Sequence, residues 1–358
     1  MKTKCRMTCR YIRAAAVTVA LILFLLTSCN GIRIIEIQAY NPAAITFPSD
    51  VRTVMIVNNS AQQPDYIGHS FVSANGVDSV MRISCDSAAY DFCQALGRAI
   101  AESPRFDDVR ICDDTLRRDS AFYEALPFNP EDVSALCERY GVDALISLDK
   151  FVLGSRYVRQ SDIAYTYLAS LVGEIRVAWP GLKTVYTVPF VDSLKWNWNW
   201  IDEDVFGRKL RNYTLADAKA ALHYLAETVA WDLRVNIIPY WSGQHRWYYT
   251  NLSSEWKRAA ILIKAEKWAE AAEVWQQLLD KSKKWKERAQ LSSNAALCYE
   301  MNGDFRRAVE LAEQTYRLYK ENLGDENDYT KIHAGYLNTL KIRLENDNKL
   351  SEQLGESQ

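Results

Sequence analysis

Hydrophobic and polar positions follow different periods in three parts of the chain. Residues 14–26 form an almost unbroken apolar run. Between residues 51 and 248, short runs rich in Val and Ile alternate with stretches whose apolar positions recur every three or four residues. Only the helical period continues over residues 249–345. The pattern predicts an α+β or α/β domain with a mixed sheet, followed by an all-α region.

The order of elements in residues 51–248 can be read in more detail. Strands are predicted at 51–57, 108–112 and 143–152, and helices at 86–101, 130–140 and 215–235. Pro180-Gly181 suits a type II turn between two β-rich stretches, 163–179 and 184–200, so these stretches predict a long antiparallel hairpin. Residues 61–80 are polar and predict a loop.

One short segment of this domain supports a resemblance. In Gly141-Val142-Asp143-Ala144-Leu145-Ile146 a helix end runs directly into a strand. With the order of elements over residues 51–240, this segment resembles the α/β domains of periplasmic proteins such as the TolB N-terminal domain and the curli-secretion lipoprotein. The resemblance implies an architecture and a compartment, and no activity.

The helical region contains an internal repeat. Residues 266–272 align with residues 303–309, each with a helical stretch ahead of it. An aromatic residue begins the second helix in both copies (Trp268, Phe305), and a small residue stands where two helices touch (Ala271, Ala308). These features resemble tetratricopeptide repeats, which implies stacked helix pairs over 249–345 that bind a protein partner.

The N-terminal segment has the features of a targeting signal. Five basic residues and no acidic one precede the apolar run, which is too short to span a hydrocarbon core of about 30 Å. The run ends in Leu26-Thr27-Ser28-Cys29, which resembles the lipobox of bacterial lipoproteins. The resemblance implies that residues 1–28 are removed and that Cys29 receives the lipid; an ordinary cleaved signal or an uncleaved anchor is the alternative.

The residues after Cys29 bear on the compartment. Asn30-Gly31-Ile32-Arg33 contains no acidic cluster of the kind that marks surface export in Bacteroidetes lipoproteins. The resemblance therefore implies attachment through the lipid to the periplasmic face of the outer membrane. Residues 29–50 are expected to be a tether and residues 346–358 a polar tail. As a whole, the chain resembles Bacteroidetes lipoproteins of uncharacterised function.

Composition and charge exclude some classes of protein. The chain has 358 residues, of which 48% are hydrophobic and 25% charged, as in folded globular proteins. Its net charge of -2 becomes -7 once the five basic residues of the leader are removed. An acidic body argues against a nucleic-acid partner, because phosphates are bound by clustered Lys and Arg.

No pattern of catalytic or metal-binding residues is found. The four His residues lie far from each other and from the cysteines, and the carboxylate clusters Asp113-Asp114 and 202–204 have no His beside them. We expect a protein that is not an enzyme and has no cofactor or metal. Buried thiols are favoured over disulfides for the five cysteines that follow Cys29, namely Cys85, Cys93, Cys112, Cys137 and Cys298.

Two aromatic clusters have competing interpretations. In 195–200, strand alternation would place Trp196, Trp198 and Trp200 on one face. Burial against the 215–235 helix is favoured for these indoles, and stacking on sugar rings is the alternative. A second cluster, in 241–249, is expected to pack at a domain junction rather than to line a ligand cleft.

These observations lead to two hypotheses for the function. The first is a non-enzymatic, membrane-anchored periplasmic lipoprotein whose helical repeats act as a protein-interaction or scaffold module. The second is a protein that binds a glycan or an envelope polymer through an exposed row of the three Trp residues.

Overall fold

The computed structural model describes residues 31–355, except residues 86, 115, 118, 160–163 and 200–214. The side chains of residues 164–165, 198–199 and 215–217 are not described either. The described chain divides into two compact units, one of residues 31–41 with 241–349, and one of residues 42–240 with 350–355. A mixed sheet followed by a region of five helices confirms the predicted fold class at that level.

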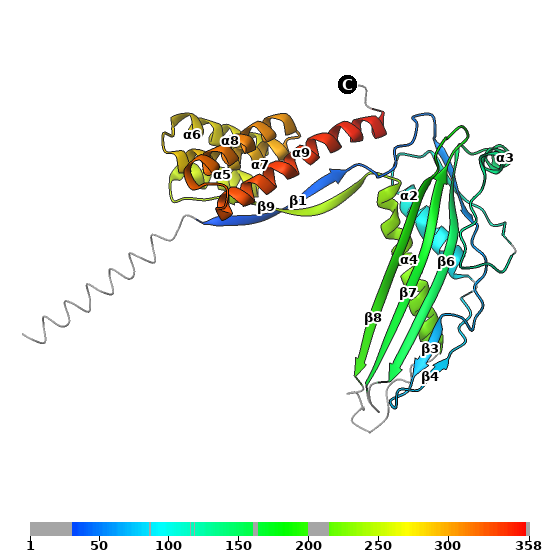
Figure 1. Cartoon of the computed structure of the whole chain (residues 1–358). Helices are drawn as coiled ribbons and strands as arrows, with labels where there is room; N and C mark the ends of the chain where they lie inside the picture. The colour runs from blue at the N-terminus through cyan, green and yellow to red at the C-terminus, as the bar shows by residue number, and fades with distance from the viewer. Residues whose placement is uncertain are drawn as a thin grey trace, which may run out of the picture. The chain divides into compact units, whose positions relative to one another are not determined.

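Residues 42–240 form a seven-stranded sheet organised around one long strand, β6 (Ala144–Arg159). One edge of β6 pairs antiparallel with β7 (Ala164–Ala178), which pairs in turn with β8 (Tyr186–Asn199). The structure thus confirms the predicted hairpin, and these three strands lie side by side in Figure 1. Gly181 in its turn has a φ of +83°, the conformation that a type II turn requires of its third residue.

The other edge of β6 is shared by two strands in succession. β2 (Thr53–Asn58) runs parallel to the first part of β6, and β3 (His69–Val72) runs parallel to its last part. β5 (Asp108–Ile111) extends the sheet beyond β2 in parallel, and β4 (Asp78–Val80) extends it beyond β3 in antiparallel. Residues 61–80, which the sequence predicted as a loop, contain both β3 and β4, so that prediction was wrong in part. These short strands are defined by the pairing of β3 with β6 and of β4 with β3.

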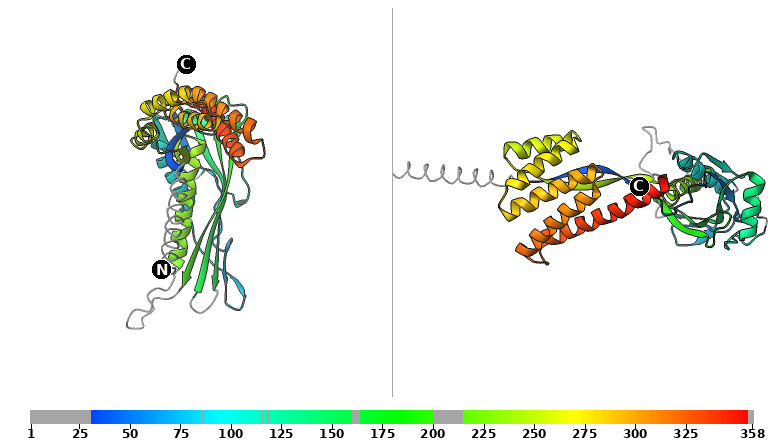
Figure 2. Two further views of the ribbon diagram at one scale, coloured as in Figure 1. Left: turned by 90° about the vertical axis from the view of Figure 1, so that its left-hand side faces the viewer. Right: turned by 90° about the horizontal axis from the view of Figure 1, so that it is seen from above.

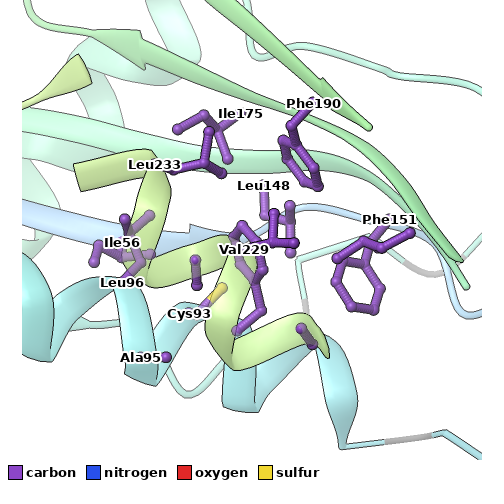
Figure 3. Packing of buried hydrophobic residues seen from close by; sticks show 14 of the residues in the cluster. Ile56, Cys93, Ala95, Leu96, Leu148, Phe151, Ile175, Phe190, Val229 and Leu233 are labelled. Carbon is purple, nitrogen blue, oxygen red and sulfur yellow. The ribbon is translucent and has the colours of Figure 1, made fainter. Parts of the chain in front are cut away.

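Both faces of the sheet are buried around β2, which explains why its sequence is continuously apolar. Val54 and Ile56 join the core under α2 (Ala88–Ala101) and α4 (Leu215–Leu233), whereas Met55 and Val57 pack with α3 (Pro130–Tyr140) on the opposite face. Figure 3 shows the core on the α2 and α4 side, where Ile56, Leu96 and Val229 converge. The predicted helices at 86–101, 130–140 and 215–235 correspond to α2, α3 and α4.

A β-bulge at Asp149 changes which face the residues of β6 occupy. The register with β7 shifts between Leu148 and Lys150, so Asp149 has no partner in the pairing. Before the bulge the even-numbered Ile146 and Leu148 face the α2 and α4 core, and after it the odd-numbered Phe151 and Leu153 do. One inserted residue thus keeps both halves of the strand packed on the same core.

The other unit contains a two-stranded sheet, β1 (Ile32–Asn41) with β9 (Tyr240–Tyr249), and five helices. The helices are α5 (Ser254–Lys264), α6 (Trp268–Lys281), α7 (Trp285–Met301), α8 (Phe305–Leu323) and α9 (Asp328–Leu354). Both views in Figure 2 and the view in Figure 1 show the helices layered over the strand pair. A strand therefore lies within the residues 29–50 that the sequence suggested as a tether.

Burial explains this difference from the expected tether. Ile37 and Ala39 of β1 are buried, and so are Ala43, Ile45 and Phe47 beyond the strand. The sequence predicted a polar tail from residue 346, but α9 continues through these positions to Leu354. Gln353 is buried and bonds the backbone of Ala43 in both directions, at 2.9 and 3.0 Å.

Two buried side chains of α7 hold β9 in place. Asn294 is fully buried, and its amide accepts a hydrogen bond from the Tyr249 N–H at 2.7 Å and donates one to the Tyr249 carbonyl at 2.8 Å. Glu300, also on α7, is fully buried and receives hydrogen bonds from Arg246, Tyr336 and Arg343. The cluster 241–249, expected at a domain junction, thus contributes β9 to the helical unit.

A buried imidazole makes the stability of the helical unit depend on pH. His333 is hydrogen-bonded to the Tyr249 hydroxyl at 2.8 Å and stacks on the Tyr319 ring at 4.7 Å, and burial lowers its pKa to about 4. The unfolded chain, with an ordinary pKa of about 6.5, takes up the proton first as the pH falls.

We therefore expect the free energy of unfolding to decrease between pH 6.5 and pH 4, by about 3 kcal/mol in total for His333. Urea unfolding at several pH values, followed by circular dichroism, measures it. His333→Gln removes this part of the slope, whereas the exposed His245→Gln is the matched control and retains it. Equal slopes for the two variants would contradict the assignment.

Candidate functional site

The residues singled out in the sequence are placed only in part. Cys29 and Trp200 lie outside the described residues, and the side chain of Trp198 is not described. Trp196 is half-buried, packs against the core, and lies with its ring 5.7 Å from that of Tyr167. The buried Tyr167 in turn donates a hydrogen bond to the Ala218 carbonyl of α4. For Trp196 the favoured interpretation, burial against the 215–235 helix, agrees with these contacts.

The other candidates are the five cysteines that follow Cys29 and the two carboxylate clusters. Cys85, Cys93, Cys112, Cys137 and Cys298, all within the described ranges, form no disulfide with one another. Burial raises the pKa of the Cys93 thiol to about 12, so this thiol stays protonated at neutral pH. Asp113 and Asp114 accept hydrogen bonds from the hydroxyls of Tyr90 and Tyr140, and residues 202–204 lie outside the described chain.

A cavity of the sheet domain lies at its forked edge. β2 leaves β6 after Leu148 and β3 joins it at Ser155, so the β6 edge between them has no neighbouring strand. A cavity of about 480 Å³ lies here, within the size range of ligand sites. It is at the carboxyl end of β2, whose two flanking helices α2 and α3 lie on opposite faces, as is usual for sites in open α/β sheets.

A side chain replaces the missing strand along part of this edge. The Gln63 amide accepts a hydrogen bond from the Leu153 N–H at 2.8 Å and donates one to the Leu153 carbonyl at 2.7 Å. The buried backbone of β6 is thereby satisfied without a pairing strand. The loop that follows β2 therefore stands away from β6 and leaves the cavity open between them.

One wall of the cavity is an ion pair that fixes its loop. Arg117 is buried and bonds both carboxylate oxygens of Asp119, at 2.6 and 3.0 Å, together with the carbonyls of Ala121 and Glu124. The Arg117 hydrogen bonds, followed by one from the Ala121 N–H, lower the pKa of Asp119 to about 2. Because the pair is bidentate, its two charges largely cancel at the cavity.

The bulge residue ties this wall to the strands. Asp149 has no exposed surface, and it accepts hydrogen bonds from Asn59 at 2.8 Å and Arg176 at 3.3 Å. Burial raises the pKa of its carboxyl, and the Asn59 hydrogen bond opposes that rise. The Arg117 guanidinium also lies 3.4 Å from the Asp149 carbonyl. The bulge thus positions both the exit of β2 and the loop that carries Asp119.

Two polar side chains keep hydrogen-bonding capacity toward the cavity. His69 is 4% exposed and bonds the Ser155 hydroxyl through Nδ1 at 2.9 Å, and no described residue bonds its Nε2. Burial lowers the pKa of His69, so the ring is neutral at neutral pH. The Asn58 Oδ1 accepts a hydrogen bond from the Ser60 hydroxyl at 2.7 Å, while the Asn58 Nδ2 has no partner among the described residues. Phe151, Leu153 and Ile83 supply an apolar floor.

Sequence reasoning did not find this cavity, although one signal for it was present. Asn58-Asn59-Ser60 and Gln62-Gln63 follow the predicted strand 51–57 directly, and polar side chains at the carboxyl end of a buried strand are typical of binding sites. The remaining lining comes from residues distant in the chain, such as His69, Arg117 and Phe151. Only the pairing of β2 and β3 with β6 brings them together.

Within the described ranges, no three His, Cys, Asp or Glu side chains are grouped as a metal ion would need. No helix within them combines the length and apolar composition needed to cross a bilayer.

Replacing Trp196 distinguishes packing from ligand stacking. Trp196→Ala should lower the free energy of unfolding by about 2 kcal/mol, because it removes a half-buried indole from the core. The neighbouring Lys195 is exposed, so Lys195→Ala is the control and should change stability by less than about 0.5 kcal/mol. Urea unfolding measures both. Unchanged stability of Trp196→Ala, with loss of a saccharide-induced fluorescence change, would support stacking on sugars instead.

Comparison with known proteins adds family membership. A family model described as Domain of unknown function (DUF8603) matches residues 51–249, and one described as Domain of unknown function (DUF6340) matches residues 257–342. No curated protein matches the chain. A solved structure described as "Crystal structure of uncharacterized protein" covers 54% of this chain and 96% of its own, at 9% identity and a TM-score of 0.24, and carries no argument about the fold. Because the first match spans more than half of the chain, the protein belongs to the family defined by Domain of unknown function (DUF8603).

Proposed function

We propose that the protein is a non-enzymatic lipoprotein, attached through Cys29 to the periplasmic face of the outer membrane, that binds a protein partner on its helical unit. The observation that carries the proposal is a pair of exposed isoleucines, Ile332 and Ile342, on α9, the last helix of the unit. Attachment and compartment rest on the lipobox resemblance of residues 26–29.

Several features support tetratricopeptide-like pairs in α5–α6 and α7–α8. Ala271 and Ala308, the small residues of the repeat, are fully buried where helices meet. Gly303 has a φ of +79°, and Glu266, at the aligned position of the first copy, has a φ of 56°. A left-handed conformation is unusual for Glu, so the shared backbone indicates that both turns have the same geometry.

The inner side of these helices is already filled by the chain itself. The Asn294 side chain of α7 is hydrogen-bonded to both the N–H and the C=O of Tyr249 in β9, as a binding groove is to an extended peptide. α7 is consequently buried nearly all round. A partner must therefore dock on another face of the unit, unless it displaces β9.

α9 offers such a face. Ile332 is 50% exposed and Ile342 is 48% exposed, and their separation of ten residues places them about 80° apart around the helix axis and about 15 Å apart along it. Gly335 lies between them, and no atom stands within 4 Å of the position where its Cβ would be. In a stack of helix pairs this outward side is where the next helix would pack. An amphipathic helix of a partner protein, with apolar residues at similar spacing, fits it.

Site-specific crosslinking tests this face. A photoreactive amino acid in place of Ile332, in the full chain expressed in its native host, should form a protein adduct, whose partner residues can be identified by mass spectrometry. Ile342→Glu in the same chain should reduce the adduct several-fold, because a carboxylate cannot enter an apolar helix interface without loss of hydration.

The control carries a charge at an apolar position of the other unit. Val191→Glu replaces an exposed residue on β8 and should leave the adduct unchanged. The proposal is contradicted if no protein adduct forms at Ile332, or if Ile342→Glu and Val191→Glu reduce it equally.

The cavity at the forked edge favours a second candidate function, binding of a small uncharged ligand. The Arg117 and Asp119 charges are paired and His69 is neutral, so the cavity offers no net charge. Its remaining hydrogen-bonding atoms, on His69 and Asn58, stand over an apolar floor. A sugar ring, with hydroxyls on its edge and C–H groups on its face, has the complementary chemistry. The glycan alternative then belongs to this cavity rather than to Trp196.

Filling the cavity tests this candidate. Neutral mono- and disaccharides should raise the melting temperature of the full chain, since a ligand that binds only the folded state stabilises it. Ala89→Leu, on α2 at the cavity wall, should abolish the shift, whereas Ala101→Leu, exposed at the end of the same helix, should preserve it. No shift with any saccharide, or an equal shift in both variants, contradicts saccharide binding in this cavity.

A further inference from the structure

The described chain begins firmly attached to the helical unit. The Gly31 carbonyl accepts hydrogen bonds from the Thr250 N–H at 2.8 Å and from the Thr250 hydroxyl at 2.9 Å. β1 begins at the next residue, and Thr250 follows directly on the end of β9. The position of Gly31 is therefore fixed close to the loop that leads into α5.

Chain length then limits the distance between this point and the lipid. Cys29 is two residues before Gly31, and an extended chain spans at most about 3.6 Å per residue. The Cys29 Cα therefore lies within about 7 Å of the Gly31 Cα. According to the proposed function, Cys29 carries the lipid. The surface around Gly31 must then be close to the membrane, because no long tether separates them.

That surface has an unusual composition. A cavity of about 360 Å³ beside Gly31 has an apolar floor that includes Trp256 and Ala260. Leu252, 62% exposed, and Ile261, 66% exposed, stand at this cavity. We call these two residues, with the basic side chains that also line it, the anchor-side patch; the basic side chains are Arg33, Lys257 and Lys264.

The two kinds of side chain in the patch match the two layers of a membrane interface. Exposed Leu and Ile gain from burial among acyl chains and glycerol groups, and Lys and Arg gain from lipid phosphates. Lys257 and Lys264 form no salt bridge within the described residues, so their charges are not neutralised locally. Ile32, which directly follows Gly31, is also exposed.

We propose that the anchor-side patch lies in the headgroup layer of the membrane to which Cys29 is attached, with Leu252 and Ile261 inserted and Arg33, Lys257 and Lys264 on lipid phosphates. This inference rests on the proposed lipid anchor and adds an orientation to it. A membrane occupies the patch rather than a protein because the anchor brings lipid to within a few residues of it, whatever else binds. The α9 face, at the opposite edge of the helical layer from α5, is left accessible to a protein partner (Figure 2).

Photocrosslinking to lipid tests the orientation. The acylated full chain, with a photoreactive amino acid in place of Ile261, is reconstituted into liposomes of phosphatidylcholine and phosphatidylglycerol. Lipid adducts, measured by mass spectrometry, should be several-fold more abundant than with the same amino acid in place of Ile342 on α9. Equal labelling at the two positions would overturn the proposal.

Charge reversal supplies the matched variants. Lys257→Glu with Lys264→Glu should reduce lipid adducts at Ile261 several-fold, because carboxylates are repelled by phosphatidylglycerol. Lys283→Glu with Lys286→Glu makes the same change of net charge on exposed residues outside the patch and should leave the adducts unchanged. An equal effect of the two pairs would show attraction by net charge alone and would also overturn the proposal.

Failure of the orientation can be told apart from failure of the anchor. The intact mass of the chain purified from membranes shows whether fatty acids are attached to it, and Cys29→Ser shows whether that residue carries them. A chain without acyl groups overturns both proposals. An acylated chain that gives no lipid adduct at Ile261, or that gives a protein adduct there in native envelopes, overturns only the orientation.

Discussion

The sheet domain depends on one strand that is longer than any of its partners on one side. β6 has 16 residues, and only the β7 and β8 side matches that length. On the other side two short parallel strands share it, and the edge between them is completed by the Gln63 side chain. The fork and the cavity lined by His69 both follow from fitting β2 and β3 to a single strand.

In the helical unit the corresponding constraint is the occupancy of the inner face by β9. Asn294 and Glu300 are fully buried polar residues on α7, and each is satisfied by groups of β9 or α9. Removing β9 would leave Asn294 without its main-chain partners and Glu300 without Arg246 inside an apolar core, which is costly. Packing of the unit's own chain therefore decides which helix faces stay exposed to a partner or a membrane. Such faces remain on α9 and at the start of α5.

The extent to which the site could be predicted follows from the range of the interactions involved. Val54 to Val57 are buried on both faces, so their composition alone indicated a central strand, and Pro180-Gly181 indicated the turn of the hairpin. The strands β3 and β4 are short, and only the pairing of β3 with β6 and of β4 with β3 defines them. The cavity was missed for the same reason, since His69, Arg117 and Phe151 are brought together by tertiary pairing.

The amino-acid sequence by itself determined the class and order of most elements between residues 51 and 345, because these depend on local periodicity and on neighbouring residue types. The tertiary structure decided that residues 32–41 form a strand, that β9 belongs with the helices, and that Trp196 packs against Tyr167. Each of these outcomes depends on contacts between residues distant in the chain, and a local pattern holds no information about which distant surface will cover it.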